Sequence, residues 1–287
     1  MKTFKGSSAW IALAAASSFG GLSAAELWPA ADSAWQAYLR TAEPHMQARL
    51  GAAGSFLWID DLPDRGLRVR RGAIVVAPGG GNGTQPVPDG LIHHWIAAGF
   101  IPRVKLSDVL RVAHDYANYK QYYRPQAVDS ALLSYNGDQR NFSMRSVYGV
   151  LFVTAVLKTE FATHEVRVDP ARCYIVSDST RIQEVENYGR SNERLLPPNH
   201  GTGYLWRLHT VTRYEERDGG VYVEMEALAL SRDIPAAIRL LFKPAIAHFS
   251  EAVLMASLRQ TREVVNAAVE TVLRSKRADM AVLAFER

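Results

Sequence analysis

Four glycines lie within five positions of the segment AIVVAPGGGNGTQPVPDGLIHHW, residues 73–95, directly after a run of β-branched residues. A glycine-rich turn binds a phosphate group when a helix follows it, because the first N–H groups of that helix face the anion. Here residues 84–88 follow, and their two prolines favour an extended segment. The sequence also has no GK[ST] element for a P-loop,. We therefore predict a connector between strands and no nucleotide site.

Histidine and carboxylate neighbours elsewhere could supply acid–base chemistry or ligate a metal. His93 and His94 are adjacent on an expected strand, so their side chains point to opposite faces of the sheet,. His164 and Glu165 diverge for the same reason. The sequence contains no HExxH motif, no GxSxG motif and no His/Cys cluster,. We therefore expect no metal, no cofactor and no assignable catalytic residue.

The first 25 residues have the three parts of a secretory signal peptide. Lys2 and Lys5 precede the apolar stretch AWIALAAASSFGGL, and small residues lead to Ala25,. Because about 20 strongly apolar residues are needed to span a bilayer, we favour a cleaved leader over a membrane anchor. We predict export to the periplasm or the medium. The single cysteine, Cys173, lies far from the cleavage site, so it could not carry a lipid there.

Charge and length narrow the class of protein further. Without the leader, 31 basic residues face 29 acidic ones, which gives a net charge of +2. Nucleic-acid binding calls for a concentrated basic face, so we expect no nucleic-acid partner. One cysteine cannot form an internal disulfide. The remaining roughly 260 residues are enough for a stable core without one.

The periodicity of apolar residues predicts helices at both ends of the chain and strands between them. Residues 33–50 favour a helix that Pro44 breaks, and residues 67–76 favour one or two short strands. A strand over residues 91–102 precedes a short helix and a further turn before Pro125. Antiparallel strands then follow, separated by the turn sequences NGD, YG, DPAR and RDGG,. The prolines at 235 and 244 each suit a first helical turn, so we predict a short helix and then one of about thirty residues.

This order of elements resembles the START-like superfamily of helix-grip proteins, which includes START lipid-transfer domains, polyketide cyclase-like proteins and pathogenesis-related plant allergens. The segments GLIHHWIAAGFIP, VLRVAHDYANYKQYYRPQAVDSALLS and YLWRLHTVTRYEERDGGVYVEMEALALSRDIP carry the resemblance. It implies an α+β fold in which a curved antiparallel sheet wraps around a long C-terminal helix, with an apolar cavity between them. We divide the chain into a leader (1–25), an N-terminal helical and strand extension (26–88) and a START-like helix-grip domain (89–287).

Alternation along the closing strand places small apolar residues on one face and a mixed set on the other. The first face has Val221, Val223, Met225, Ala227 and Ala229; the second has Tyr222, Glu224, Glu226, Leu228 and Leu230,. A small apolar face opposite a helix indicates either a cavity or close helix packing. For a cavity, the predicted apolar lining is Trp95, Tyr116, Phe142, Met144, Phe152, Trp206, Met225, Phe242, Phe249 and Leu258. The nearest polar groups that could orient a ligand are His209, Arg213, Glu224 and Glu226. Alternatively, these polar side chains form a cross-strand ion pair that faces solvent.

The leading hypothesis is an exported, noncatalytic carrier of a hydrophobic small molecule such as a lipid. Each buried methylene contributes about 0.8 kcal/mol, so few specific polar contacts would be needed. Such a carrier could also contact a membrane transiently. The cyclase-like members of the superfamily imply an alternative, a cyclase- or hydrolase-like enzyme in which Glu226 or His209 assists proton transfer. A third hypothesis is a protein-interaction module whose sheet or N-terminal helix docks a partner. The oligomeric state stays open.

Overall fold

The computed structural model describes residues 25–50, 55–150, 153–233 and 236–285. Side chains are described for the same residues except Val150, Val153 and those of residues 236–249 and 276–285. The predicted leader, apart from Ala25, lies outside the described residues, and so does Phe152. Phe242 and Phe249 lie on a described helix, but their side chains are outside the described set.

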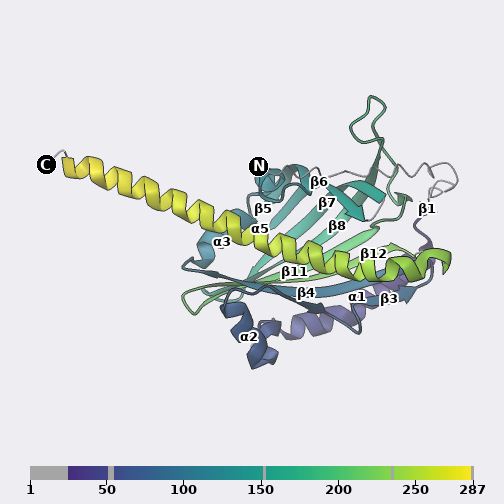
Figure 1. Ribbon diagram of the computed structural model, residues 1–287, viewed down its shortest axis with the longest axis horizontal. Coiled ribbons are helices and arrows are strands. Elements are labelled where there is room, and N and C mark those ends of the chain that lie inside the picture. The colour runs from purple at the N-terminus through teal and green to yellow at the C-terminus, as the bar shows by residue number, and fades with distance from the viewer. Residues whose placement is uncertain (1–24, 51–54, 151–152, 234–235, 286–287) are drawn as a thin grey trace, which may run out of the picture.

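One strongly curved antiparallel sheet forms the centre of the fold (Figure 1). Its strands lie in the order β2, β4, β12, β11, β8, β7, β6 and β5, while β3 also pairs with β4 and β9 with β8. Their bounds are β2 (Val75–Pro78), β3 (Thr84–Val87), β4 (Gly90–Pro102), β5 (Ala127–Asn136), β6 (Gln139–Val150), β7 (Val153–Arg167), β8 (Arg172–Glu186), β9 (Arg194–Leu195), β11 (Arg207–Arg217) and β12 (Gly220–Arg232). A separate short pair joins β1 (Ala25–Glu26) to β10 (His200–Gly201). The predicted run of antiparallel strands is confirmed.

Helices precede the sheet, interrupt it once and close the chain. They are α1 (Pro29–Ala48), η1 (Trp58–Asp61), α2 (Pro63–Arg70), α3 (Leu106–Ala113), η2 (Tyr116–Asn118), α4 (Tyr119–Tyr122) and α5 (Ala236–Phe285). Helix α5 crosses the sheet, and its C-terminal part extends beyond it (Figure 1). The order β4, α3, α4, strands β5 to β12 and α5 is the predicted helix-grip arrangement, which is confirmed.

Three local predictions are wrong. Helix α1 runs through Pro44 without a break, because Ala42 and Met46 on either side of the proline are both buried against the sheet and hold the helix in line. Residues 63–70 form a helix and not a strand, with Pro63 in its first turn and Arg68 and Arg70 in its last,. The closing segment is a single helix of 50 residues that continues through Pro244.

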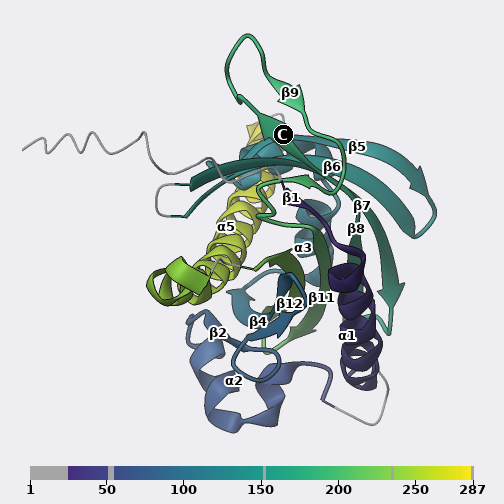
Figure 2. The same ribbon diagram turned by 90° about the vertical axis from the view of Figure 1, so that its right-hand side faces the viewer.

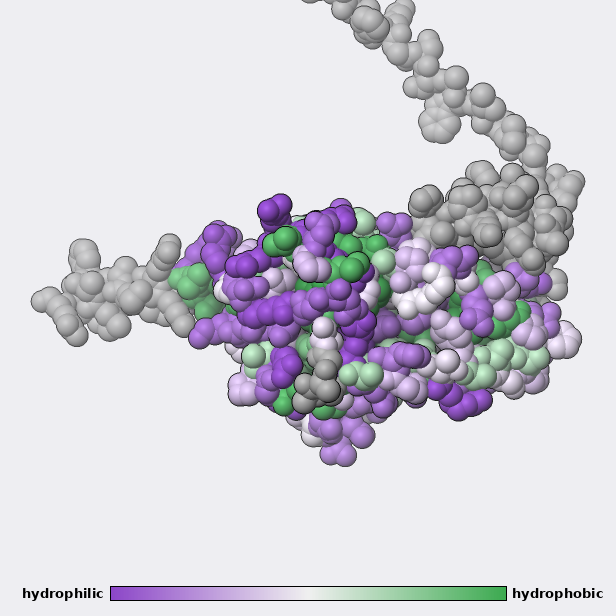
Figure 3. Space-filling view, turned by 90° about the horizontal axis from the view of Figure 1, so that it is seen from below, coloured by the Kyte–Doolittle hydropathy of each residue, from purple (hydrophilic) through white to green (hydrophobic). Residues whose placement is uncertain are grey.

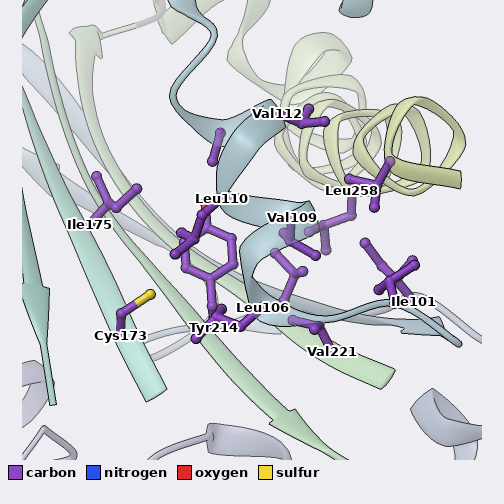
Figure 4. Packing of buried hydrophobic residues seen from close by; sticks show 14 of the residues in the cluster. Ile101, Leu106, Val109, Leu110, Val112, Cys173, Ile175, Tyr214, Val221 and Leu258 are labelled. Carbon is purple, nitrogen blue, oxygen red and sulfur yellow. The ribbon is translucent and has the colours of Figure 1, made fainter. Parts of the chain in front are cut away.

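The face of the sheet that meets α5, here called the inner face, carries the largest hydrophobic cluster. Leu254, Leu258 and Val265 of α5 pack in it together with residues of β4, β12 and α3. Figure 4 shows Val109 and Leu110 of α3 in the same cluster. The apolar stripe predicted on the closing helix therefore faces the sheet, as an amphipathic helix requires.

The opposite face, here called the outer face, is covered by the N-terminal extension. Figure 2 shows α1 and α5 on opposite sides of β4, β12 and β11. Trp35 and Met46 of α1 pack on Leu228 and Leu230 of β12. Further along the same face, residues of η1 and α2 pack on Phe100 of β4. Strands β4, β12 and β11 are thus enclosed between two layers of helices, and both faces of this part of the sheet carry apolar cores.

Candidate functional site

The glycine-rich stretch is a connector between strands, as predicted. It links β2 to β3, both of which pair with β4. Its backbone forms two hydrogen bonds with the backbone of His94: Gly79 N–H donates to the His94 carbonyl (2.9 Å), and His94 N–H donates to the Gly83 carbonyl (3.0 Å). A Cβ atom at Gly79 would lie 2.3 Å from the His94 ring, and one at Gly83, whose φ is +84°, would lie 2.6 Å from the Trp95 ring. The glycines are therefore required by two aromatic rings of β4.

Six of the predicted cavity residues do lie on the inner face. Trp95, Met225 and Leu258 belong to or contact the cluster beneath α5. Tyr116, Phe142 and Met144 belong to or contact a second cluster, towards the β6 and β7 side of the sheet. There the ring of Phe142 stacks on Tyr116 at 4.4 Å and on Phe161 at 4.7 Å between ring centroids.

The remaining described candidates lie on the outer face, so the prediction that they line a cavity against α5 is wrong. Trp206 packs in the α1 cluster, while His209, Arg213 and Glu226 are buried on the same side of the sheet. Alternation was predicted correctly, and the small apolar set does face α5; the error was to add residues of the opposite set to the predicted lining. Because α1 covers the outer face, that face is also buried, and polar residues there are as enclosed as core residues.

A hydrogen-bonded chain, here called the outer-face network, joins these polar side chains. Arg213 donates to Glu226 Oε2 (2.8 Å), to Glu224 Oε1 (3.2 Å) and to the Met46 carbonyl of α1 (3.4 Å). Glu226 Oε1 lies 2.9 Å from His94 Nε2, and His94 Nδ1 lies 2.9 Å from the Tyr38 hydroxyl. The side chains of Arg213 and Glu224 are 0% exposed. The alternative of an ion pair that faces solvent is therefore also wrong.

The two carboxyl groups of the network differ in their protonation. Burial raises the pKa of Glu224 to about 7, although Arg213 and the backbone of Trp58 act in the other direction,. Burial also acts to raise the pKa of Glu226, but the hydrogen bonds from His94 and Arg213 outweigh it and lower that pKa. The guanidinium of Arg213 thus donates hydrogen bonds to the ionised carboxylate of Glu226 and to the carboxyl group of Glu224, which holds a proton near neutral pH.

We expect the substitution Glu224→Gln to remove a pH dependence of stability. Between the ordinary pKa of Glu224 and about 7, the folded chain binds a proton that the unfolded chain has released, so native stability falls as pH rises through this window. An amide cannot ionise, yet its oxygen still accepts from Arg213. Between pH 4.5 and 8, the free energy of unfolding of the variant should therefore rise relative to that of the native protein by on the order of 2–3 kcal/mol. Urea unfolding at several pH values measures the difference.

Glu270→Gln is the matched control, because Glu270 is exposed on α5 and pairs with Arg274 at the surface. Its free energy of unfolding should follow that of the native protein at each pH. If the Glu224→Gln curve also runs parallel to the native curve, Glu224 does not retain its proton in the fold.

Two other histidines pair with a carboxylate, although the buried Nε2 of His209 has no hydrogen-bond partner among the described residues. His209 Nδ1 lies 2.7 Å from Asp178 on the neighbouring strand. His114 Nε2 lies 2.6 Å from Glu165, and the hydrogen bond from His114 lowers the pKa of Glu165. Within the described ranges, no group of three His, Cys, Asp or Glu side chains is placed to hold a metal ion.

Part of the inner face is less tightly covered than the outer face, although Thr212, Tyr214, Val221 and Val223 on the same side of β11 and β12 are buried. On β11 and β12, the inner-face residues Leu208, Thr210, Met225, Ala227 and Ala229 are all partly exposed, although α5 crosses this side of the sheet. The intervening outer-face residues are all buried: His209, Val211, Arg213, Glu224, Glu226, Leu228 and Leu230. Accessible apolar surface therefore remains between the sheet and α5.

Two buried nitrogens lie on the same inner face of β4. Neither His93 Nδ1 nor Trp95 Nε1 has a hydrogen-bond partner among the residues that the structure describes. Burial lowers the pKa of His93 to about 4, so its imidazole is neutral near pH 7,. His93 and His94 point to opposite faces, as predicted, with His93 bonded to Ser231 and His94 to Glu226.

The order and pairing of these elements define a START-like, helix-grip fold. No protein-family model matches the chain, and no curated protein matches it. Similar solved structures include human STARD10 (8% identity, TM-score 0.43, covering 78% of this chain and 86% of that one). The Zhui aromatase/cyclase from Streptomyces sp. R1128 is 11% identical, with a TM-score of 0.43, and the match covers 62% of this chain and 96% of that one. A STAR-related lipid transfer protein fragment from Xanthomonas axonopodis is 13% identical, with a TM-score of 0.40, and the match covers 67% of this chain and 98% of that one.

Proposed function

We propose that the protein binds and carries a hydrophobic small molecule, such as a lipid, between the inner face of the sheet and α5. The partial exposure of inner-face residues of β11 and β12 beneath α5 carries this proposal. In a fully packed sheet–helix interface such residues would be buried to the same degree as those of the outer face. A ligand that covers them gains about 25 cal/mol for each Å² of apolar surface removed from water.

The unpaired nitrogens of β4 favour a ligand with a polar end. Trp95 Nε1 is a donor, and it lies two positions from the neutral imidazole of His93 on the same face,. Ligand pockets combine apolar walls with a few polar groups that fix orientation. A fatty acid or similar amphiphile that accepts a hydrogen bond from Trp95 would satisfy a donor that otherwise costs stability.

Native mass spectrometry of the mature protein, purified from its own host, tests the proposal. Organic extraction should then release and identify a stoichiometric apolar molecule. An apo mass, together with no thermal stabilisation by fatty acids, sterols or phospholipids, would contradict the carrier function and favour the interaction module.

Filling the accessible space with a larger side chain should block uptake. We expect Ala227→Trp to weaken the binding of a fluorescent fatty acid by about tenfold or more, which equals about 1.4 kcal/mol or more, because the indole occupies the ligand's volume. Met225→Trp provides a second variant in case the first is too large for the core. Ala37→Trp introduces the same ring on the exposed side of α1 and should leave binding unchanged. Equal affinities in all of these variants would place the ligand elsewhere.

We also propose export and transient membrane contact, for delivery of such a ligand. The export proposal rests on the predicted leader, and amino-terminal sequencing of the protein from its host tests it, since cleavage would leave a start near Glu26. For the membrane step, none of the helices in the described part of the chain is long and apolar enough to cross a bilayer. Contact would therefore be peripheral, and vesicle co-sedimentation measures it.

A further inference from the structure

A pocket of about 460 Å³ lies on the outer face, on the side of the sheet opposite to the proposed lipid site. Its floor is formed by His94, Ile96 and Glu226, and one wall by α1, including Tyr38 and Ala42. Trp58 of η1 and the glycines 79 and 80 also line it, and the rest of the lining is Thr41, His45, Ala48, Arg49 and Ser55. Figure 3 views the molecule from below, the side on which α1 and α2 lie in Figure 1, and shows hydrophilic residues interleaved with smaller hydrophobic groups.

The outer-face network fixes the hydrogen-bonding character of the pocket floor. Ionised Glu226 accepts from Arg213 and from His94 Nε2. With its Nε2–H directed at Glu226, His94 presents Nδ1 as the acceptor for the Tyr38 hydroxyl,. Burial and the nearby Glu226 raise the pKa of Tyr38, so the phenol keeps its proton. The Tyr38 hydroxyl therefore donates a hydrogen bond to His94, and its oxygen can only accept a hydrogen bond from a ligand.

The remaining lining combines aromatic and aliphatic surface with the polar or charged side chains of Thr41, His45, Arg49 and Ser55. Trp58 and Tyr38 contribute aromatic rings, and Ala42 and Ile96 contribute aliphatic surface. Gly80 keeps the space over the floor open, because a Cβ atom there would lie 3.0 Å from the Tyr38 hydroxyl and 3.2 Å from His94 Nδ1. The cleft therefore combines apolar walls with several polar groups, as small-molecule sites do, and among these the Tyr38 hydroxyl is oriented by its hydrogen bond with His94,.

We propose that this pocket is a second ligand site, which binds a small ring-containing molecule through one hydroxyl or N–H group that donates to the Tyr38 oxygen. The site is independent of the lipid proposed at the inner face, because the sheet separates the two. The Tyr38–His94–Glu226 chain orients the acceptor, and Arg213 holds the carboxylate at its far end.

Binding of 2-naphthol, with 2-methoxynaphthalene as its matched control, tests the proposal. Both probes present the same ring system, but only naphthol has a donor. In a ¹H–¹⁵N titration of the full chain, naphthol should shift the amides of Tyr38, Gly79, Gly80 and His94 saturably. It should bind about fivefold more tightly than the ether, the effect of one net hydrogen bond.

Two variants locate the probe and its hydrogen bond. Tyr38→Phe removes the acceptor and should abolish the preference for naphthol, while Tyr135→Phe, at an exposed tyrosine of β5, should keep it. Gly80→Ala adds a methyl group over the floor and should weaken both probes, whereas Gly149→Ala, where a Cβ atom meets no other atom within 4 Å, should weaken neither.

Three results would overturn the proposal. They are the absence of saturable shifts at the pocket residues, equal affinities of the two probes for the native chain, and shifts that are confined to inner-face residues. In the last case the Ala227→Trp variant should also lose the shifts, which would assign the probe to the lipid site. Shifts at the pocket residues that survive Ala227→Trp support two separate sites.

Discussion

Replacing Arg213 by methionine is expected to lower the free energy of unfolding by about 3–5 kcal/mol. Arg213 is fully buried and is hydrogen-bonded to both Glu226 and Glu224. Methionine fills much of the same volume but leaves Glu226 without its buried cation. The loss of stability therefore arises because the buried carboxylate of Glu226 loses its cation, and not because a cavity forms. Chemical denaturation monitored by circular dichroism measures it.

The control lies on the same strand and the same face. Arg207 pairs with Asp32 of α1 at 3.0 Å, but both side chains are partly exposed, so Arg207→Met should cost at most about 1 kcal/mol. A further variant separates charge from packing. Adding Glu224→Gln and Glu226→Gln to Arg213→Met removes the charges that the single substitution leaves unpaired. This triple variant should be more stable than Arg213→Met alone. If it is less stable, the network contributes through its shape and not through its charges.

The order of elements was predictable because each signal in it is local. Alternation gives the strands, turn residues separate them, and the 3.6-residue period marks α3 and α5. Two of the three local errors, those in α1 and α2, arise because tertiary packing overrides a local preference. Pro44 is tolerated in α1 because Ala42 and Met46 hold both halves of the helix on the sheet. Alternation at Leu67 and Val69 resembles a strand, although only Val69 is buried and Leu67 is exposed on α2.

The candidate site was less predictable, because a period of two separates residues into sets without saying what covers each set. Sequence reasoning grouped Glu226 with Met225 although they are neighbours on one strand and must face opposite sides. It also missed Tyr38 and His94, whose contacts with the network span 56 residues and 132 residues of sequence. One signal was present. Gly79 and Gly80 precede a histidine on the paired strand, and glycines in such a position often mark a close approach.

Removal of residues 26–70 is the second large effect that we expect, and it should abolish cooperative unfolding. The outer face would then expose side chains that the N-terminal helices bury, including Ile92, Phe100, Tyr222, Leu228 and Leu230. Each large apolar side chain contributes about 1.5–3 kcal/mol when fully buried, and whole domains are stable by only about 5–15 kcal/mol. The free-energy cost of exposing several such side chains and the outer-face network therefore exceeds the stability of the whole domain.

Thermal unfolding and binding of a hydrophobic dye measure this effect, and a C-terminal truncation provides the control. A chain that ends at Arg274 loses a segment of α5 that extends beyond the sheet (Figure 1), after residues that are exposed, so it should unfold at nearly the native temperature. A cooperative, monomeric protein without residues 26–70 would instead mean that the extension is separable from the helix-grip domain. Even then the shortened chain should bind naphthol no more tightly than 2-methoxynaphthalene, because it lacks Tyr38, the acceptor of the outer pocket.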